Sequence, residues 1–78
     1  MRRVGEVVGV AESLAVCRAP GTEVPALGTA VVDDSLTDVG EVVDVFGPVD
    51  RPYLAVSPAA DVHLAGLVGD ALYAREEV

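Results

Sequence analysis

One stretch decides the fold of this chain: residues 40–53, which read GEVVDVFGPVDRPY. The valine-rich run ends at Phe46, and β-branched side chains disfavour a helix because their χ1 angles are restricted there. We therefore predict a strand over residues 39–46 that is buried on both faces. Gly47 frees the backbone and Pro48 removes a hydrogen-bond donor, so this strand ends at Phe46. The next strand begins at Tyr53.

Phe46 and Tyr53, the large rings of this stretch, flank one short turn. Stiff aromatic side chains on a preformed turn are typical of an anchor at a protein interface. The alternative is that Phe46 fills a small core and Tyr53 covers its edge, since buried aromatic residues are common. The two rings by themselves leave both interpretations open.

The composition predicts one small, soluble β-domain. The chain has 78 residues, of which 51% are hydrophobic, but only one Phe, two Tyr and no Trp, so valine, leucine and alanine must build the core. No apolar run reaches the roughly 18 residues that span a membrane, and no signal-peptide core is visible. We expect a single domain over residues 1–75, a frayed terminus over residues 76–78 and a cytoplasmic location.

The charge balance is strongly acidic, with 13 Asp and Glu against five arginines, no lysine and a net charge of −8. Such a surface repels phosphate, which argues against autonomous binding of nucleic acid. Because the acids are scattered and lysine is absent, we interpret the composition as adaptation to a salt-rich cytoplasm, where the Debye length falls to about 3 Å at 1 M salt. A basic partner surface is a second explanation, compatible with the first.

Short β-type segments separated by turn residues fill the rest of the chain. We predict six strands, over residues 2–10, 14–18, 29–32, 39–46, 53–57 and 70–74. A loop rich in proline and glycine occupies residues 19–28, and residues 61–64 are a candidate helical turn. Six strands without a long amphipathic helix predict an all-β fold, a small closed six-stranded β-barrel, because closure removes exposed strand edges.

The first strand has an irregular pattern. We place Val4, Val8 and Val10 on one face and Val7 on the other. The glycines at positions 5 and 9 predict bulges or close backbone approaches, as in a tightly curved barrel.

Residues that carry chemistry are few. His63, the only histidine, lies in the least regular stretch and is interpreted as a surface residue. Cys17 has no partner cysteine and is predicted to be buried and inert. Asp33 and Asp34 precede a serine and are predicted to serve turn hydrogen bonds. We therefore predict no catalytic residue, no metal site, no cofactor and no small-molecule ligand.

The strand–turn–strand element resembles a known signature. Its pattern Gly40-x-x-x-Asp44-x-Phe46-Gly47-Pro48-x-x-x-Pro52-Tyr53 is similar to that of the GAR proteins of box H/ACA ribonucleoproteins, which share their barrel with the related NAF assembly factor. Weaker similarities follow in the family's order: Arg3-x-Gly5-x-Val7, Leu27-Gly28-x-x-Val31-Val32-Asp33 and Val68-Gly69-Asp70-x-Leu72-Tyr73. The resemblance covers nearly the whole chain.

The resemblance implies a translation-factor-like barrel without catalysis of its own, in its minimal archaeal form. Family members dock on the catalytic pseudouridine synthase subunit of the H/ACA complex and reach guide RNA only through that complex. They favour loading and release of substrate RNA by acting on a mobile loop of the synthase, in rRNA processing and ribosome biogenesis. The chain departs from most members at Arg51, where they carry more basic charge.

The turn and the resemblance point to the same partner-binding residues. We expect these to be Val45, Phe46, Gly47, Pro48, Pro52 and Tyr53.

Three other functions remain open. A free-standing RNA-binding or translation-factor-like barrel requires a basic or aromatic-lined groove. A small enzyme requires a pocket with convergent titratable groups. The related H/ACA assembly factor usually carries further segments beyond the barrel.

Overall fold

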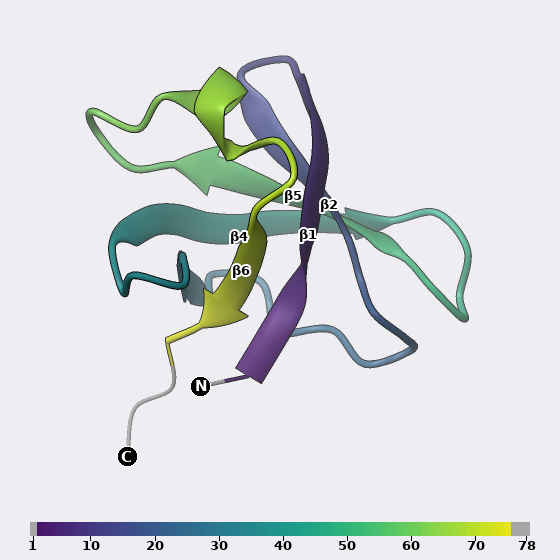
Figure 1. Cartoon of the computed structure of the whole chain (residues 1–78). Helices are drawn as coiled ribbons and strands as arrows, with labels where there is room; N and C mark the ends of the chain where they lie inside the picture. The colour runs from purple at the N-terminus through teal and green to yellow at the C-terminus, as the bar shows by residue number, and fades with distance from the viewer. Residues whose placement is uncertain (1, 76–78) are drawn as a thin grey trace.

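The computed structural model describes residues 2–75, and the frayed terminus expected over residues 76–78 lies outside the described residues. The elements are β1 (Arg2–Ala11), β2 (Leu14–Arg18), β3 (Ala30–Val32), β4 (Asp38–Phe46), β5 (Tyr53–Pro58), the 3-10 helix η1 (Leu64–Leu67) and β6 (Ala71–Ala74). The strands close into an antiparallel barrel in the order β1-β2-β5-β4-β3-β6, and β6 returns to β1 (Figure 1). This confirms the predicted all-β fold.

Valine, leucine and alanine fill the barrel, as the composition predicts. The side chains with no exposed surface include Val7, Cys17, Val42, Leu54 and Leu72, each from a different strand. Leu67 of η1 closes one end of this core. The backbone after η1 is fastened to β1, since the Val7 amide donates to the carbonyl of Asp70 at 2.9 Å.

Two bulges in β1 change which valines face inward. The register passes from Arg3↔Tyr73 to Gly5↔Leu72, and again from Val7↔Cys17 to Gly9↔Val16. The predicted bulges at Gly5 and Gly9 are therefore confirmed. A Cβ atom on Gly5 would lie 2.5 Å from the carbonyl oxygen of Arg18, so this strand also makes the predicted close approach.

The predicted faces of β1 were wrong as a result. Val4 and Val7 are both buried, whereas Val8 and Val10 are exposed. Each bulge adds one residue opposite a single partner, so the alternation of inward and outward side chains shifts at that point.

β4 is not buried on both faces, contrary to the prediction. Only Val39 and Val42 are buried, while Val43 lies on the solvent side next to a third bulge, between Val42 and Asp44. A barrel wall has one inner and one outer face, so a single layer of strands cannot bury both.

The helical turn lies slightly later than predicted, at residues 64–67 rather than 61–64. Asp61 has a φ of 70°, in the left-handed region, and such a residue cannot form part of a right-handed turn. No helix of the described chain is long and apolar enough to cross a membrane.

Candidate functional site at the β4–β5 hairpin

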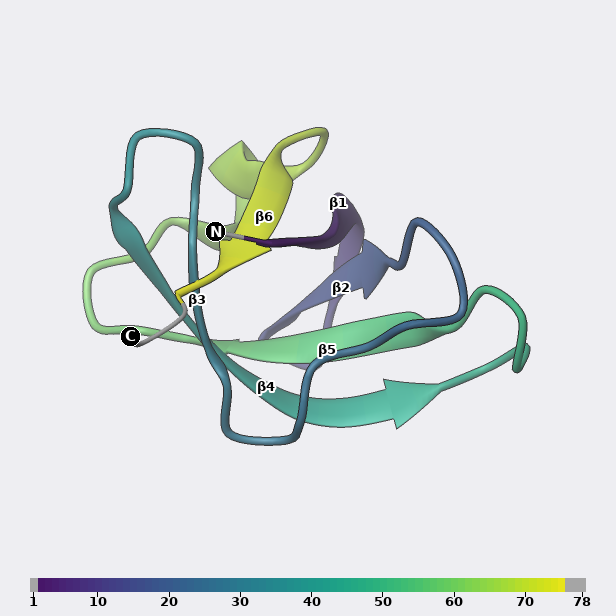
Figure 2. The same cartoon turned by 90° about the horizontal axis from the view of Figure 1, so that it is seen from below.

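β4 and β5 run side by side, and the loop that joins them, residues 47–52, projects away from the barrel (Figures 1 and 2). At the base of this loop Phe46 pairs with Tyr53. Their rings stack with centroids 5.6 Å apart and an angle of 18° between the planes. Phe46 is 45% exposed, so the interpretation that it fills the core is wrong. The two rings form an outward-facing apolar surface.

Gly47 is required where the chain leaves the stack. Its φ is 90°, which L side chains rarely adopt, and an added Cβ atom would lie 2.9 Å from Cδ2 of Tyr53. Glycine therefore serves both the left-handed backbone and the close approach of the Tyr53 ring.

Arg18, at the end of β2, also packs on the Tyr53 ring, so Tyr53 lies between Phe46 and Arg18 across the three strands. Its guanidinium carbon lies 4.5 Å from the centroid of the Tyr53 ring, and one terminal nitrogen donates to the Tyr53 hydroxyl at 2.8 Å. Sequence reasoning missed Arg18. The signal was present, since Arg18 and Cys17 must face opposite sides of a strand, but the pairing Arg18↔Tyr53 depends on a register that one strand cannot reveal.

Further hydrogen bonds tie this stack to the loop after β2. The Nε of Arg18 donates to the carbonyl of Arg51 at 3.1 Å, and the Nε of Arg51 donates to the carbonyl of Ala19 at 3.0 Å. The Ala19 amide donates to the carbonyl of Pro52 at 2.9 Å. The aromatic stack is therefore held in one arrangement before any partner binds, which limits the entropy lost on binding.

The six residues predicted to bind a partner have different environments. Phe46, Gly47 and Pro48 are exposed and Tyr53 is half-buried. Val45 packs against the core and Pro52 is buried, so these two hold the hairpin rather than present a surface. Val49, at the loop tip, was not predicted, although it is 90% exposed and extends the apolar surface.

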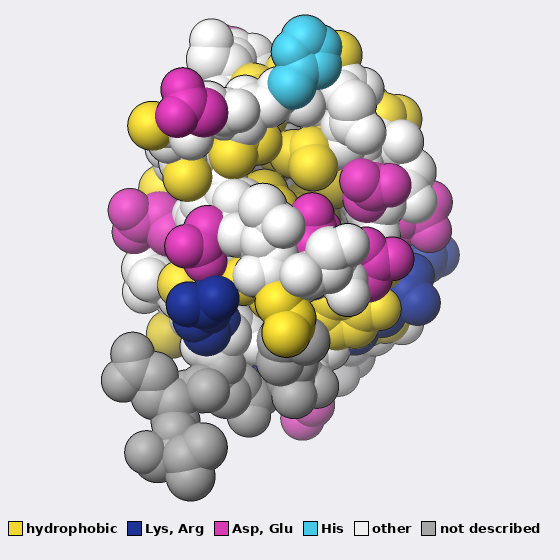
Figure 3. All heavy atoms as spheres, turned by 60° about the vertical axis from the view of Figure 1, so that its left-hand side comes forward, with side chains coloured by type: hydrophobic (Ala, Val, Ile, Leu, Met, Phe, Trp, Pro, Cys, Tyr) yellow, Lys and Arg dark blue, Asp and Glu magenta, His cyan; other side chains and the backbone are white. Residues whose placement is uncertain are grey.

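His63, Cys17 and Asp33 have the environments that the sequence predicts, whereas the side chain of Asp34 makes no turn hydrogen bond within residues 2–75. His63 is exposed, and the histidine stands at the surface in Figure 3, where acidic side chains are spread singly over the face. Cys17 is fully buried, and this burial raises the pKa of its thiol to about 11. Asp33 accepts hydrogen bonds from the amides of Ser35 and Thr37 at 2.9 and 3.0 Å, which confirms its role in the turn.

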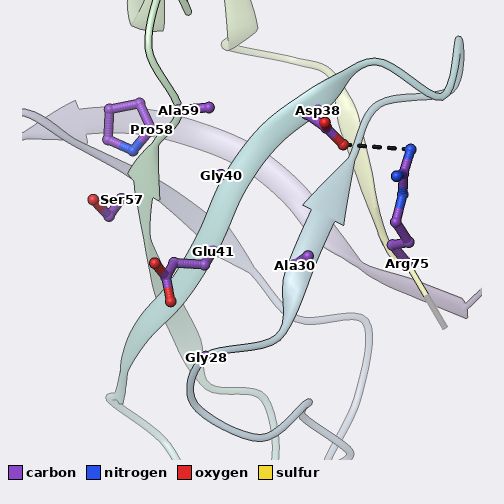
Figure 4. A pocket seen from close by; sticks show the side chains of 9 residues that line it. All are labelled: Gly28, Ala30, Asp38, Gly40, Glu41, Ser57, Pro58, Ala59 and Arg75. Carbon is purple, nitrogen blue, oxygen red and sulfur yellow. Dashed lines mark ion pairs between the residues drawn. The ribbon is translucent and has the colours of Figure 1, made fainter. Parts of the chain in front are cut away.

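A hollow of about 470 Å³ lies on the outer side of β3, β4 and β5 (Figure 4). Small residues form most of its lining, which consists of Gly28, Ala30, Asp38, Gly40, Glu41, Ser57, Pro58, Ala59 and Arg75. Arg75 and Asp38 form an ion pair of 3.4 Å, and Glu41 lies apart from them. Among residues 2–75, no three His, Cys, Asp or Glu side chains come together as a metal-binding group would require.

Comparison with known proteins identifies a family for the whole chain. The family model described as "Gar1/Naf1 RNA binding region" matches residues 1–78. A search of curated proteins found no match.

Proposed function

The chain belongs to the Gar1/Naf1 family, and from this premise we propose that it is the GAR-type accessory subunit of an H/ACA RNA-guided pseudouridine synthase. The family supports association with H/ACA ribonucleoproteins. In this proposal the chain docks on the catalytic subunit and supplies no catalytic group. It promotes loading and release of substrate RNA during rRNA pseudouridylation, in the cytoplasm of a halophilic archaeon.

The observation that carries the proposal is the ordered, exposed stack at the hairpin. Phe46 keeps 45% of its surface in solvent although the chain has few large apolar side chains to build its core. Tyr53 and Arg18 hold its position through the ring contacts and the 2.8 Å hydrogen bond. Aromatic and arginine side chains on a rigid element are the usual anchors of a protein interface.

A subunit of this kind raises turnover through its partner's conformation. A ligand shifts an equilibrium only when it binds one state better than the other. The equilibrium proposed here is between the open and closed positions of the synthase loop that clamps the substrate. Loop opening and product release limit the turnover of many enzymes.

The experiment that tests this role compares single-turnover and multiple-turnover rates of pseudouridine formation, with and without the chain. Omission should slow multiple turnover more than the isomerisation of RNA already bound in the active site. His63→Ala and Asp34→Asn should keep full stimulation, because both side chains are exposed and lie outside the hairpin. If either variant lost stimulation while it still folded and docked, the chain would instead contribute a group to catalysis.

Direct contact with RNA is a second candidate, favoured by the family description and by the placement of the arginines. Arg2 and Arg3 line a cavity of about 280 Å³ with part of the loop after β2. Arg18 directly precedes this loop, and Arg51 binds the carbonyl of Ala19 in it. Four of the five arginines thus border one loop on an otherwise acidic chain.

A gel shift with guide RNA separates the two candidates. The isolated chain should show no shift at moderate salt, because most nonspecific affinity comes from lysine and arginine neutralising phosphate, and the net charge is −8. Micromolar binding by the chain alone would favour the RNA-binding candidate. The assembly-factor alternative predicts that the chain is displaced before the complex becomes active, which the composition of the purified active complex would show.

A further inference from the structure

The outer wall of the barrel carries an apolar row next to the hairpin stack. We call this row the valine band: Val8 on β1, Val16 on β2, Ala55 on β5 and Val43 on β4. The register sets Val16 opposite Ala55, and Ala55 opposite Asp44. Val8 and Val43 are the unpaired residues of two bulges, each directly beside this row. The band therefore crosses four neighbouring strands.

Ala55 shows that this row faces away from the core. Its neighbours Leu54 and Val56 are inside the barrel, so Ala55 points outward by the alternation of a strand. It is nevertheless only 5% exposed and does not belong to the core cluster. Ala55, at the centre of the band, thus has little contact with water although it lies on the outer wall. Val8 and Val43, at the two ends of the band, are 49% and 41% exposed.

The bulges supply the two exposed valines. A bulge adds a residue that makes no ladder pair and redirects its side chain. In the second bulge of β1 and in the bulge of β4 against β5, the added residue is Val8 or Val43, a valine on the solvent side that contributes nothing to the core. Both bulges flank the Val16–Ala55 pair, whose direct partners are Gly9 on β1 and Asp44 on β4, so the two exposed valines lie at the two ends of this pair.

The valine band continues into the hairpin stack. Arg18 follows Val16 by two residues on β2, and Tyr53 precedes Ala55 by two residues on β5. Two residues along a strand span about 7 Å, so the two rows are nearest neighbours on one wall. The aromatic surface and the band form a single face.

The charges beside the band indicate its partner. Asp44 lies next to Val43, and Glu41 lies opposite Ser57, which follows Ala55 by two residues. Both carboxylates are exposed, and Arg18 is already engaged with Tyr53 and the Arg51 carbonyl. A second copy of this chain would bring a further −8 against the same acids. The complementary surface is apolar and bordered by lysine or arginine.

We propose that the valine band binds an apolar patch bordered by basic residues on the catalytic synthase subunit. This inference rests on the proposed docking function and extends the docking face from the hairpin to the outer wall of β2, β5 and β4.

The first test is a steric one. Ala55→Gln adds a side chain that projects from the band, and it should weaken binding of the purified catalytic subunit at least tenfold. Ala71→Gln is the matched control, because Ala71 also lies on the outer wall, on β6 opposite the exposed Glu6. It should bind within twofold of wild type, and thermal melts should show both variants folded.

Two further pairs of substitutions, each with a matched control, change the band with less risk to folding. Val43→Thr preserves shape and removes apolar surface, and it should weaken binding roughly threefold. Val68→Thr should not, although Val68 is the more exposed of the two, at 51% against 41%. Asp44→Asn keeps an oxygen for the 2.8 Å bond from the Val45 amide but removes the charge. It should weaken binding at low salt, while Asp34→Asn, with the same change of net charge, should not.

The outcomes separate the two proposals. If wild type binds the synthase and the band variants bind within twofold of it, the band is not part of the interface and the hairpin proposal stands. If wild type does not bind, the docking function itself fails, and the band proposal with it. Light scattering that shows a wild-type dimer which Ala55→Gln dissociates would overturn the proposal in favour of a second copy.

Discussion

Both faces of β5 carry apolar side chains, and we expect the two faces to serve different purposes. Leu54 and Val56 face the interior with no exposed surface. Tyr53 faces outward beside Phe46, and Ala55 faces outward as part of the valine band. The inner face is explained by the fold, because a small barrel needs every apolar side chain it can bury. The outer face is not, since the exposed side chains around it, Phe46, Val43 and Val8, leave apolar surface in water that contributes nothing to the core. We therefore propose that one side of the strand serves stability and the other side serves recognition.

The largest effect should come from the inner face. Leu54→Ala removes a fully buried side chain and should lower the free energy of unfolding by about 2–5 kcal/mol, measured by denaturant titration. Docking of the folded protein, measured in stabilising salt, should be unchanged. A variant that kept its stability but lost docking would reverse the assignment of the two faces.

Tyr53→Ala, one residue away, should give the opposite result. Loss of the ring removes the contacts with Phe46 and Arg18 and should weaken docking by about 2 kcal/mol or more, roughly thirtyfold. Tyr53→Phe is the control, because it keeps the ring and loses only the hydrogen bond from Arg18. Calorimetric titration against the synthase measures both. If the alanine variant folds and binds as tightly as wild type, the hairpin is not a docking site.

The stability of the barrel should also depend on high pH through Cys17, which is paired with Leu54 on the neighbouring strand. Burial raises the pKa of the thiol from its ordinary value of 9.0 to about 11. Below pH 9 both folded and unfolded states keep the proton, and stability is unaffected. Between pH 9 and 11 only the unfolded state ionises, so about 2 kcal/mol of stability should be lost by pH 10.5.

Cys17→Val isolates this contribution, because it keeps an apolar side chain at the site and cannot ionise. Its stability, measured by denaturant titration at pH 7 and pH 10.5, should fall less than that of wild type. Equal losses in the two proteins would show that the thiol ionises as readily in the folded barrel as in the unfolded chain.

The smallest effect concerns the charges, which all lie on outer surfaces: among residues 2–75 no charged side chain is buried. Screening reduces repulsion within a net charge of −8, so the thermal midpoint should rise by several degrees from about 0.1 M to multimolar KCl. A flat midpoint would mean that the acids serve a basic partner rather than the solvent.

The strands and turns of this fold were predictable from local sequence. The run that ends at Phe46-Gly47-Pro48 and the acceptor role of Asp33 both follow from the chemistry of neighbouring residues. The faces of β1 and β4 were not predictable, because a bulge shifts the alternation by one residue and its location depends on the pairing strand. The six predicted site residues all lie on one β4–β5 hairpin, and their role in binding stays a prediction. They do not include Arg18, which reaches Tyr53 only through the pairing of β2 with β5.

The pairing of β1 with β6 also determines when this protein can fold. Glu6 pairs with Ala71, 65 residues later in the chain, so the wall between them forms only after β6 has left the ribosome. Contacts at such sequence separation slow folding, because a long loop must close before they form. Until then the nascent valine-rich strands are incompletely covered and prone to aggregate. The acidic side chains on these strands then have a second use during synthesis, since like charges keep unfinished chains apart.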